Sequence, residues 1–112
     1  MCLGRCFAST SDQPHGPLSD QRSIPLLGLG TWKHTPEQAA QAVECALDTG
    51  YKHIDCATAY SNHEAIGEVF KSKFSGGGVK REDVWITSKL FNSDHASPSV
   101  RTSHGTEYGW TV

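Results

Sequence analysis

The chain lacks the features that mark membrane proteins and nucleic-acid-binding proteins. No apolar run approaches the roughly 20 residues that a membrane-spanning helix requires, so no membrane partner is expected. Lys and Arg together number 10 against 12 Asp and Glu residues, a formal net charge of -2 that argues against a nucleic acid held by a basic surface. These absences favour a cytoplasmic protein. Residues 1–16 are interpreted as a disordered lead-in, and a transit peptide is the less favoured interpretation of their basic, serine-rich start.

Metal-binding and phosphate-binding motifs are also absent. The cysteines form no CxxC pair and no zinc-ligand spacing, so no metal is expected and free or buried thiols fit best: Cys2, Cys6, Cys45 and Cys56. The run from Gly28 through Gly30 to Lys33 lacks the third glycine of a dinucleotide fingerprint and has no Walker pattern. A small doubly wound nucleotide-binding module is therefore a weak interpretation of this chain.

What is present is an alternation of short apolar runs and helical patterns. The runs predict three short strands, at residues 26–30, 52–57 and 84–90, each pair separated by a helix. This β-α-β-α-β order implies parallel strands with right-handed crossovers. Residues 18–25, which precede the first strand, predict a short hairpin.

The first helix has clear start and stop signals. Thr35 is a good N-cap, Pro36 suits the first helical position, and Gln38 can complete a capping box. Gly50 is the expected stop. The apolar face of this helix consists of Ala39, Val43, Ala46 and Leu47. The second helix is predicted from about Asn62 to Lys71, before the break at residues 76–78, with an inner face of Ile66, Val69 and Phe70.

Three reactive side chains lie at or just after the ends of the later strands. Asp55 lies near the C-terminal end of the second strand, Tyr60 follows five residues later, and Lys89 lies near the C-terminal end of the third strand. A lysine charge favours the phenolate form of a tyrosine, and a carboxylate can hold the lysine. A phenol with an ordinary pKa of about 10 can thereby act as an acid at neutral pH. Taken alone, an aspartate at a strand end is more often a helix cap or a loop residue.

Three blocks of sequence resemble the aldo-keto reductases, in the family's order: residues 24–33, 50–60 and 80–92. The resemblance covers Ile24 to Ala96 and implies an α/β fold, the (β/α)8 TIM barrel. It also implies a monomeric enzyme that uses NADPH to reduce aldehydes or ketones. A complete barrel needs about 250 residues, and the chain has 112. We therefore expect a truncated barrel over residues 17–96, with the hairpin and the first three strands, followed by an unmatched tail over residues 97–112.

The same resemblance implies roles for individual residues. Tyr60 would be the general acid that protonates the carbonyl oxygen, assisted by Lys89 and Asp55. The residues implied at the nicotinamide end of NADPH are Gly30, Thr31, Trp32 and Asp55, and Lys33 would reach the diphosphate. Trp32 and Phe91 would wall the carbonyl pocket, although such aromatic pairs are otherwise usually core packing.

The chain departs from the family pattern at several positions. Gln21 stands in the hairpin turn where relatives often carry glycine, which tolerates a positive φ better. His63 stands where relatives commonly carry glutamate, and no residue matches the family's active-site histidine. We interpret His53 as a hydrogen-bonded residue inside the barrel and not as a substrate contact.

Two hypotheses about function remain open at this level. The first is an NADPH-dependent aldo-keto reductase that uses the trio of Asp55, Tyr60 and Lys89. The second is a catalytically inactive partial barrel, because three parallel strands leave two open edges and an inner face without an opposing wall.

Overall fold

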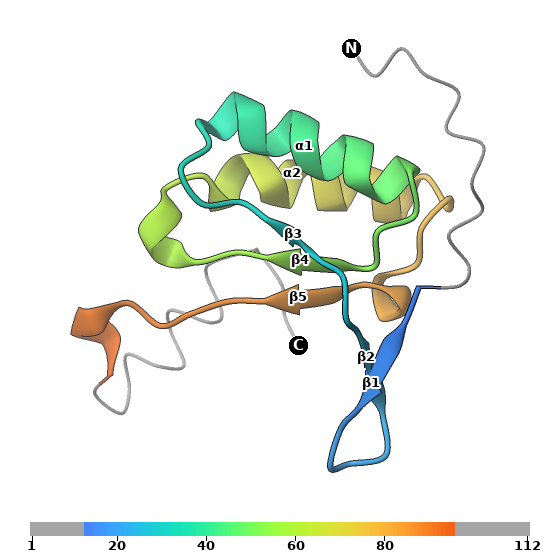
Figure 1. The fold of residues 1–112 in the computed structure, drawn as a ribbon. Helices are drawn as coiled ribbons and strands as arrows, with labels where there is room; N and C mark the ends of the chain where they lie inside the picture. The colour runs from blue at the N-terminus through green and yellow to red at the C-terminus, as the bar shows by residue number, and fades with distance from the viewer. Residues whose placement is uncertain (1–12, 96–112) are drawn as a thin grey trace.

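A computed structural model describes residues 13–95 of the chain. Two antiparallel strands form a hairpin, and three parallel strands form a sheet in which they lie in chain order. Helices α1 (Pro36–Asp48) and α2 (His63–Ser75) pack side by side on one face of that sheet (Figure 1). The strands are β1 (His15–Pro17), β2 (Ser23–Pro25), β3 (Leu29–Gly30), β4 (His53–Asp55) and β5 (Trp85–Thr87). The predicted parallel β-α-β-α-β order is confirmed.

Helix α1 begins and ends where its sequence predicts. The backbone amide of Gln38 donates to the Thr35 hydroxyl at 3.3 Å, and the Gln38 side-chain oxygen accepts from the Thr35 amide at 3.1 Å. This reciprocal pair satisfies two backbone donors that the first turn would otherwise leave free. After the helix, Gly50 takes a φ of 96°, a conformation that glycine adopts without a steric penalty.

The core lies between the helices and the sheet. The predicted apolar face of α1 is buried in full, and Ile66 and Phe70 of α2 are also buried. Leu29, Ile54 and Ile86 are aligned across the three strands and contribute to this core. Because side chains alternate along a strand, the neighbouring residues of β4 and β5 project from the opposite face.

Helix α2 extends four residues beyond the predicted end near Lys71, to Ser75, and Gly76 is its C-cap. Lys73, in the last turn, contacts two carboxylates of α1: it lies 2.7 Å from Asp48 and 3.2 Å from Glu44. The extension therefore adds an ionic contact between the two helices.

The hairpin begins at His15, inside the segment 1–16 that was predicted to be a disordered lead-in. The Leu26 amide donates to the Pro14 carbonyl at 2.9 Å, which continues the β1–β2 ladder beyond the predicted start. The same bond draws Leu26 away from the parallel sheet, so β3 is shorter than the predicted strand at residues 26–30. The predicted strands at 52–57 and 84–90 likewise shorten to three residues each.

The cysteine prediction is only partly confirmed. Cys56, which follows β4, carries a thiol that is not disulfide-bonded, and the residue is fully buried. Cys45 of α1 is disulfide-bonded, so the expectation of a free or buried thiol is wrong there. Cys45 is half-buried on the flank of α1, so its sulfur is not sealed in the core as the Cys56 thiol is. Within residues 13–95, neither helix is long and apolar enough to span a bilayer.

Candidate active site

Asp55 and Lys89 meet at the carboxyl-terminal edge of the parallel sheet. The Lys89 ammonium donates to Asp55 Oδ1 at 2.6 Å and to the Cys56 carbonyl at 3.1 Å. Asp55 is the last residue of β4, and Lys89 lies two residues beyond β5, so adjacent strands bring them together. This edge is where parallel α/β barrels place their catalytic groups.

Tyr60 completes the predicted trio. It ends the short 3-10 helix η1 (Thr58–Tyr60), in which its amide donates to the Ala57 carbonyl at 3.0 Å. The Lys89 ammonium lies 5.1 Å from the centroid of the Tyr60 ring. The acid, the phenol and the amine therefore share one site, as the sequence indicated.

The electrostatics of this site keep Lys89 charged. Burial alone would lower the pKa of Lys89, but hydrogen bonds to the Asp55 carboxylate and the Tyr60 hydroxyl, together with the charge of Asp55, raise it above its ordinary value. A lysine with a raised pKa remains an ammonium ion at neutral pH. It can therefore act as a fixed positive charge beside the phenol.

The residues predicted to contact the cofactor lie along the end of β3 and differ from one another in solvent exposure. Thr31 is fully buried, and its amide and hydroxyl both donate to the Asp55 carbonyl, at 3.1 and 2.9 Å. Gly30 pairs with Asp55 in the sheet, and a Cβ added at Gly30 would meet no atom of residues 13–95 within 4 Å. The edge beside Asp55 is therefore open at Gly30, whereas the Thr31 side chain is committed to the protein interior.

The predicted aromatic residues are exposed. Trp32 is 65% exposed and Phe91 is 46% exposed, so neither serves as core packing. The Lys33 ammonium lies 4.7 Å from the Trp32 ring centroid, in a cation–π contact, and Lys33 has a φ of 63°. These side chains are accessible at the positions where the family resemblance implies a ligand.

His53 has the structural role that the sequence predicted. Its Nδ1 lies 3.1 Å from the Pro25 carbonyl, and its Nε2 lies 2.8 Å from the Thr87 hydroxyl. A carbonyl can only accept, so Nδ1 donates, and in the neutral imidazole Nε2 accepts from Thr87. The ring thus ties the hairpin to β4 and β5, away from the Lys89 end of the sheet.

Asn62 also belongs to this region, although its sequence context did not predict this. Asn62 is 2% exposed, and its side-chain amide donates to the Thr31 carbonyl at 2.9 Å and to the His34 carbonyl at 3.2 Å. Its position before α2 suggested only a helix start. The acceptors are backbone atoms about 30 residues earlier, which no side-chain motif reveals.

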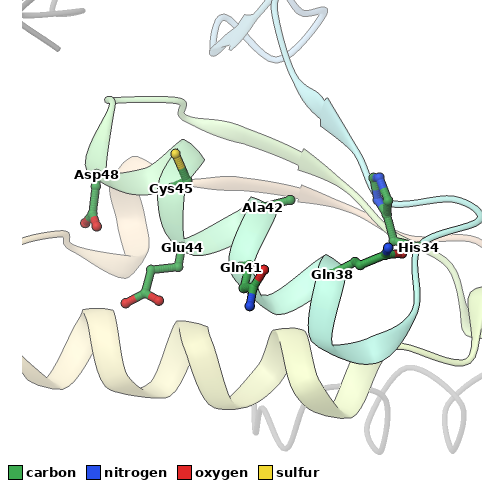
Figure 2. Close-up of a pocket in the computed structure, with 7 residues that line it drawn as sticks. All are labelled: His34, Gln38, Gln41, Ala42, Glu44, Cys45 and Asp48. Carbon is green, nitrogen blue, oxygen red and sulfur yellow. The ribbon is translucent and has the colours of Figure 1, made fainter. Parts of the chain in front are cut away.

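A cavity of about 680 Å³ lies on the flank of α1 (Figure 2). Its lining consists of His34, Gln38, Gln41, Ala42, Glu44, Cys45 and Asp48. None of the predicted site residues lines this cavity. Most of these residues are of polar types, as expected on the outer side of an amphipathic helix.

Comparison with known proteins supports the predicted family. The profile of the aldo/keto reductase family matches residues 26–107. This match extends into residues 97–107 of the predicted tail, which lies outside the described residues. An aldo/keto reductase of Synechocystis is 48% identical over 94 residues, which are 84% of this chain and 29% of the relative. Aldo-keto reductase family 1 member A1 of Gallus gallus is 51% identical over 84 residues, 74% of this chain and 26% of the relative.

A solved structure gives the same result for the fold. A crystal structure of a Bombyx mori aldo-keto reductase in complex with NADP has a TM-score of 0.75 and 32% identity, over 87% of this chain and 34% of that chain. The predicted partial (β/α)8 barrel is confirmed, and the chain spans 26% to 34% of the length of these relatives. The chain belongs to the aldo/keto reductase family.

Proposed function

We propose that this site performs the proton-transfer part of an NADPH-dependent reduction of aldehydes or ketones. In the overall reaction, a carbonyl compound, NADPH and a proton give an alcohol and NADP⁺. The proposal rests on one observation above all: the Lys89 ammonium contacts Asp55 and also lies beside Tyr60. The trio supplies a proton donor and a fixed positive charge next to it.

In this proposal Tyr60 donates its hydroxyl proton to the carbonyl oxygen while the carbonyl carbon is reduced. The ammonium of Lys89 favours loss of that proton, because it stabilises the negative charge that develops on the phenol oxygen. Asp55 holds the ammonium in place through the 2.6 Å contact. A proton from solvent then restores the phenol before the next turnover.

The residues at the end of β3 fit a nicotinamide cofactor, which when bound supplies the hydride. Open space at Gly30 leaves room for a flat ring beside Asp55, and the exposed Trp32 offers an apolar surface next to it. The Bombyx mori relative binds NADP, which supports the choice of cofactor. We assign Lys33 to the diphosphate, and Trp32 and Phe91 to the walls of the carbonyl pocket.

The inactive partial barrel is the competing function, and the sheet supports it. Within residues 13–95, β3 and β5 are both edge strands, and both helices lie on the same face of the sheet. An open edge and an uncovered face weaken the exclusion of water that carbonyl reduction requires.

Two experiments distinguish the two functions. The full chain is titrated with NADPH while fluorescence is monitored, and it is then assayed with a panel of aldehydes and ketones. Saturable binding with turnover supports the reductase. Turnover should disappear in Tyr60→Phe while binding persists, and the control Tyr51→Phe, at a tyrosine packed against the core, should retain both. Binding without turnover, or neither, establishes the inactive partial barrel.

A further inference from the structure

Asn62 holds together two parts of the site that are distant in sequence. It is the N-cap residue of α2, yet its side chain makes no capping hydrogen bond to that helix. Its amide donates instead to the carbonyls of Thr31 and His34, in the loop between β3 and α1. Both partners are acceptors, so the orientation of the side-chain amide is fixed by its contacts.

The contact continues from Thr31 to Asp55. The amide and hydroxyl of Thr31 both donate to the Asp55 carbonyl, and Thr31 is fully buried. Every polar atom of Thr31 therefore lies in this chain of hydrogen bonds: its carbonyl accepts from Asn62, and its two donors hold Asp55. The backbone of Asp55 is fixed on one side by Thr31, while its carboxylate holds Lys89 on the other.

The chain of contacts returns to Tyr60 through a short backbone link. Ser61, the only residue between Tyr60 and Asn62, has a φ of 55° and ends η1. Asn62 is thus anchored two residues from the phenol and is hydrogen-bonded, through Thr31, to the residue that holds the ammonium. A shift of Asn62 would change the position of Tyr60 relative to Lys89.

We propose that Asn62 is a positioning residue, which acts through Thr31 to set the geometry of Asp55 and Lys89 relative to Tyr60. Its catalytic consequence rests on the proposed reductase function. Its structural consequence does not, because the hydrogen bonds exist whether or not the chain turns over substrate.

The decisive measurement is the pKa of Lys89, determined by NMR titration of full chains that carry carbon-13 at the lysine ε position. Asn62→Leu keeps a branched side chain of similar size and removes both donors. We expect the pKa of Lys89 to fall toward its ordinary value, because a displaced Asp55 holds the ammonium less closely. Asn92→Ala, at the other asparagine of the chain and at an exposed position, is the control and should leave it unchanged.

Lys73 distinguishes positioning from a general loss of structure. Its pKa is also raised, chiefly by its hydrogen bond to Asp48, in a contact between α1 and α2. Positioning predicts a fall at Lys89 with no change at Lys73. A fall at both lysines, or at neither, overturns the proposal.

A second pair of variants tests the same chain of contacts if Asn62→Leu does not fold. Thr31→Val removes the hydroxyl that donates to Asp55, and Thr31→Ser retains it. The pKa of Lys89 should fall in the first variant and stay raised in the second, and equal values in both contradict the proposal. Where the wild type turns over substrate, Asn62→Leu should lower kcat by about tenfold or more with little change in KM. An inactive wild type refutes the reductase function alone, since the pKa measurements still decide the role of Asn62.

Discussion

The Lys89 ammonium lies 2.6 Å from the Asp55 carboxylate, although the two residues are 34 positions apart. Strand pairing explains the contact, because Asp55 is aligned with Thr87 in the parallel sheet and Lys89 follows two residues later. Lys89 thus leaves the sheet beside the end of β4, and its ammonium reaches the Asp55 carboxylate there. The register of β4 against β5 therefore creates the charged centre of the site.

This contact predicts a dependence of stability on pH. The pKa of Lys89 is raised in the folded chain, so its ion pair contributes fully below the ordinary lysine pKa of about 10.4 and is lost as pH rises through the folded-state value. We expect the difference in unfolding free energy between the wild type and Lys89→Met to shrink above that pH. Urea unfolding at a series of pH values measures it.

Lys73→Met is the matched control, because the pKa of Lys73 is also raised but its partners belong to α1. The difference in unfolding free energy between the wild type and Lys73→Met should shrink in the same alkaline range. Of the two variants, only Lys89→Met should abolish turnover. The experiment covers buffers from about pH 9 to pH 12. If the difference in unfolding free energy between the wild type and Lys89→Met stays constant over this range, a functional ion pair at Lys89 is contradicted.

The contact of Lys73 with Asp48 and Glu44 gives a separate prediction for the two helices. Replacing Lys73 by methionine should lower the free energy of unfolding by about 1 kcal/mol at low salt, since the carboxylates are exposed and such pairs are weak. The loss should diminish in about 1 M salt, where surface charges are screened. Thermal unfolding at both salt concentrations checks this, and a salt-independent loss would assign the effect to packing.

Gln21 offers a stabilising substitution. It occupies the hairpin turn with a φ of 69°, in the left-handed region that a side chain disfavours. Gln21→Gly should therefore raise the free energy of unfolding by roughly 1 kcal/mol, once relief of this strain is set against the greater entropy of an unfolded glycine. The control Ser19→Gly, at an exposed position of the same turn without a positive φ, should be neutral or destabilising. Urea midpoints for both variants provide the comparison.

The sequence predicted what depends on local chemistry or on family pattern, and missed what depends on backbone contacts between distant segments. The capping box of α1 could be predicted because Thr35 and Gln38 are three residues apart and bond to each other. The trio of Asp55, Tyr60 and Lys89 was identified by its resemblance to a family. The place of Thr31 was not foreseen in the same way: its hydroxyl faces a carbonyl 24 residues away, which no spacing rule reveals.

Gly28 and Gly30 lie two residues apart and predict opposite outcomes when each is replaced by alanine. At Gly28 an added Cβ would lie 3.1 Å from both the ring and the backbone carbonyl of His53, closer than ordinary contact allows. His53 is held by hydrogen bonds to Pro25 and Thr87, so it cannot move aside without breaking them. Gly28→Ala should therefore lower the unfolding free energy by about 1 to 3 kcal/mol.

At Gly30 an added Cβ would meet no atom within 4 Å in the described part of the chain, so Gly30→Ala should fold with the stability of the wild type. Its methyl group would nevertheless occupy the open edge beside Asp55, where we place the nicotinamide ring. NADPH affinity should therefore fall in Gly30→Ala even though the fold is unchanged, which a fluorescence titration together with thermal unfolding can detect. Unaltered affinity in a normally folded Gly30→Ala would show that the ring does not lie against β3, and the cofactor would then have to be assigned to another surface.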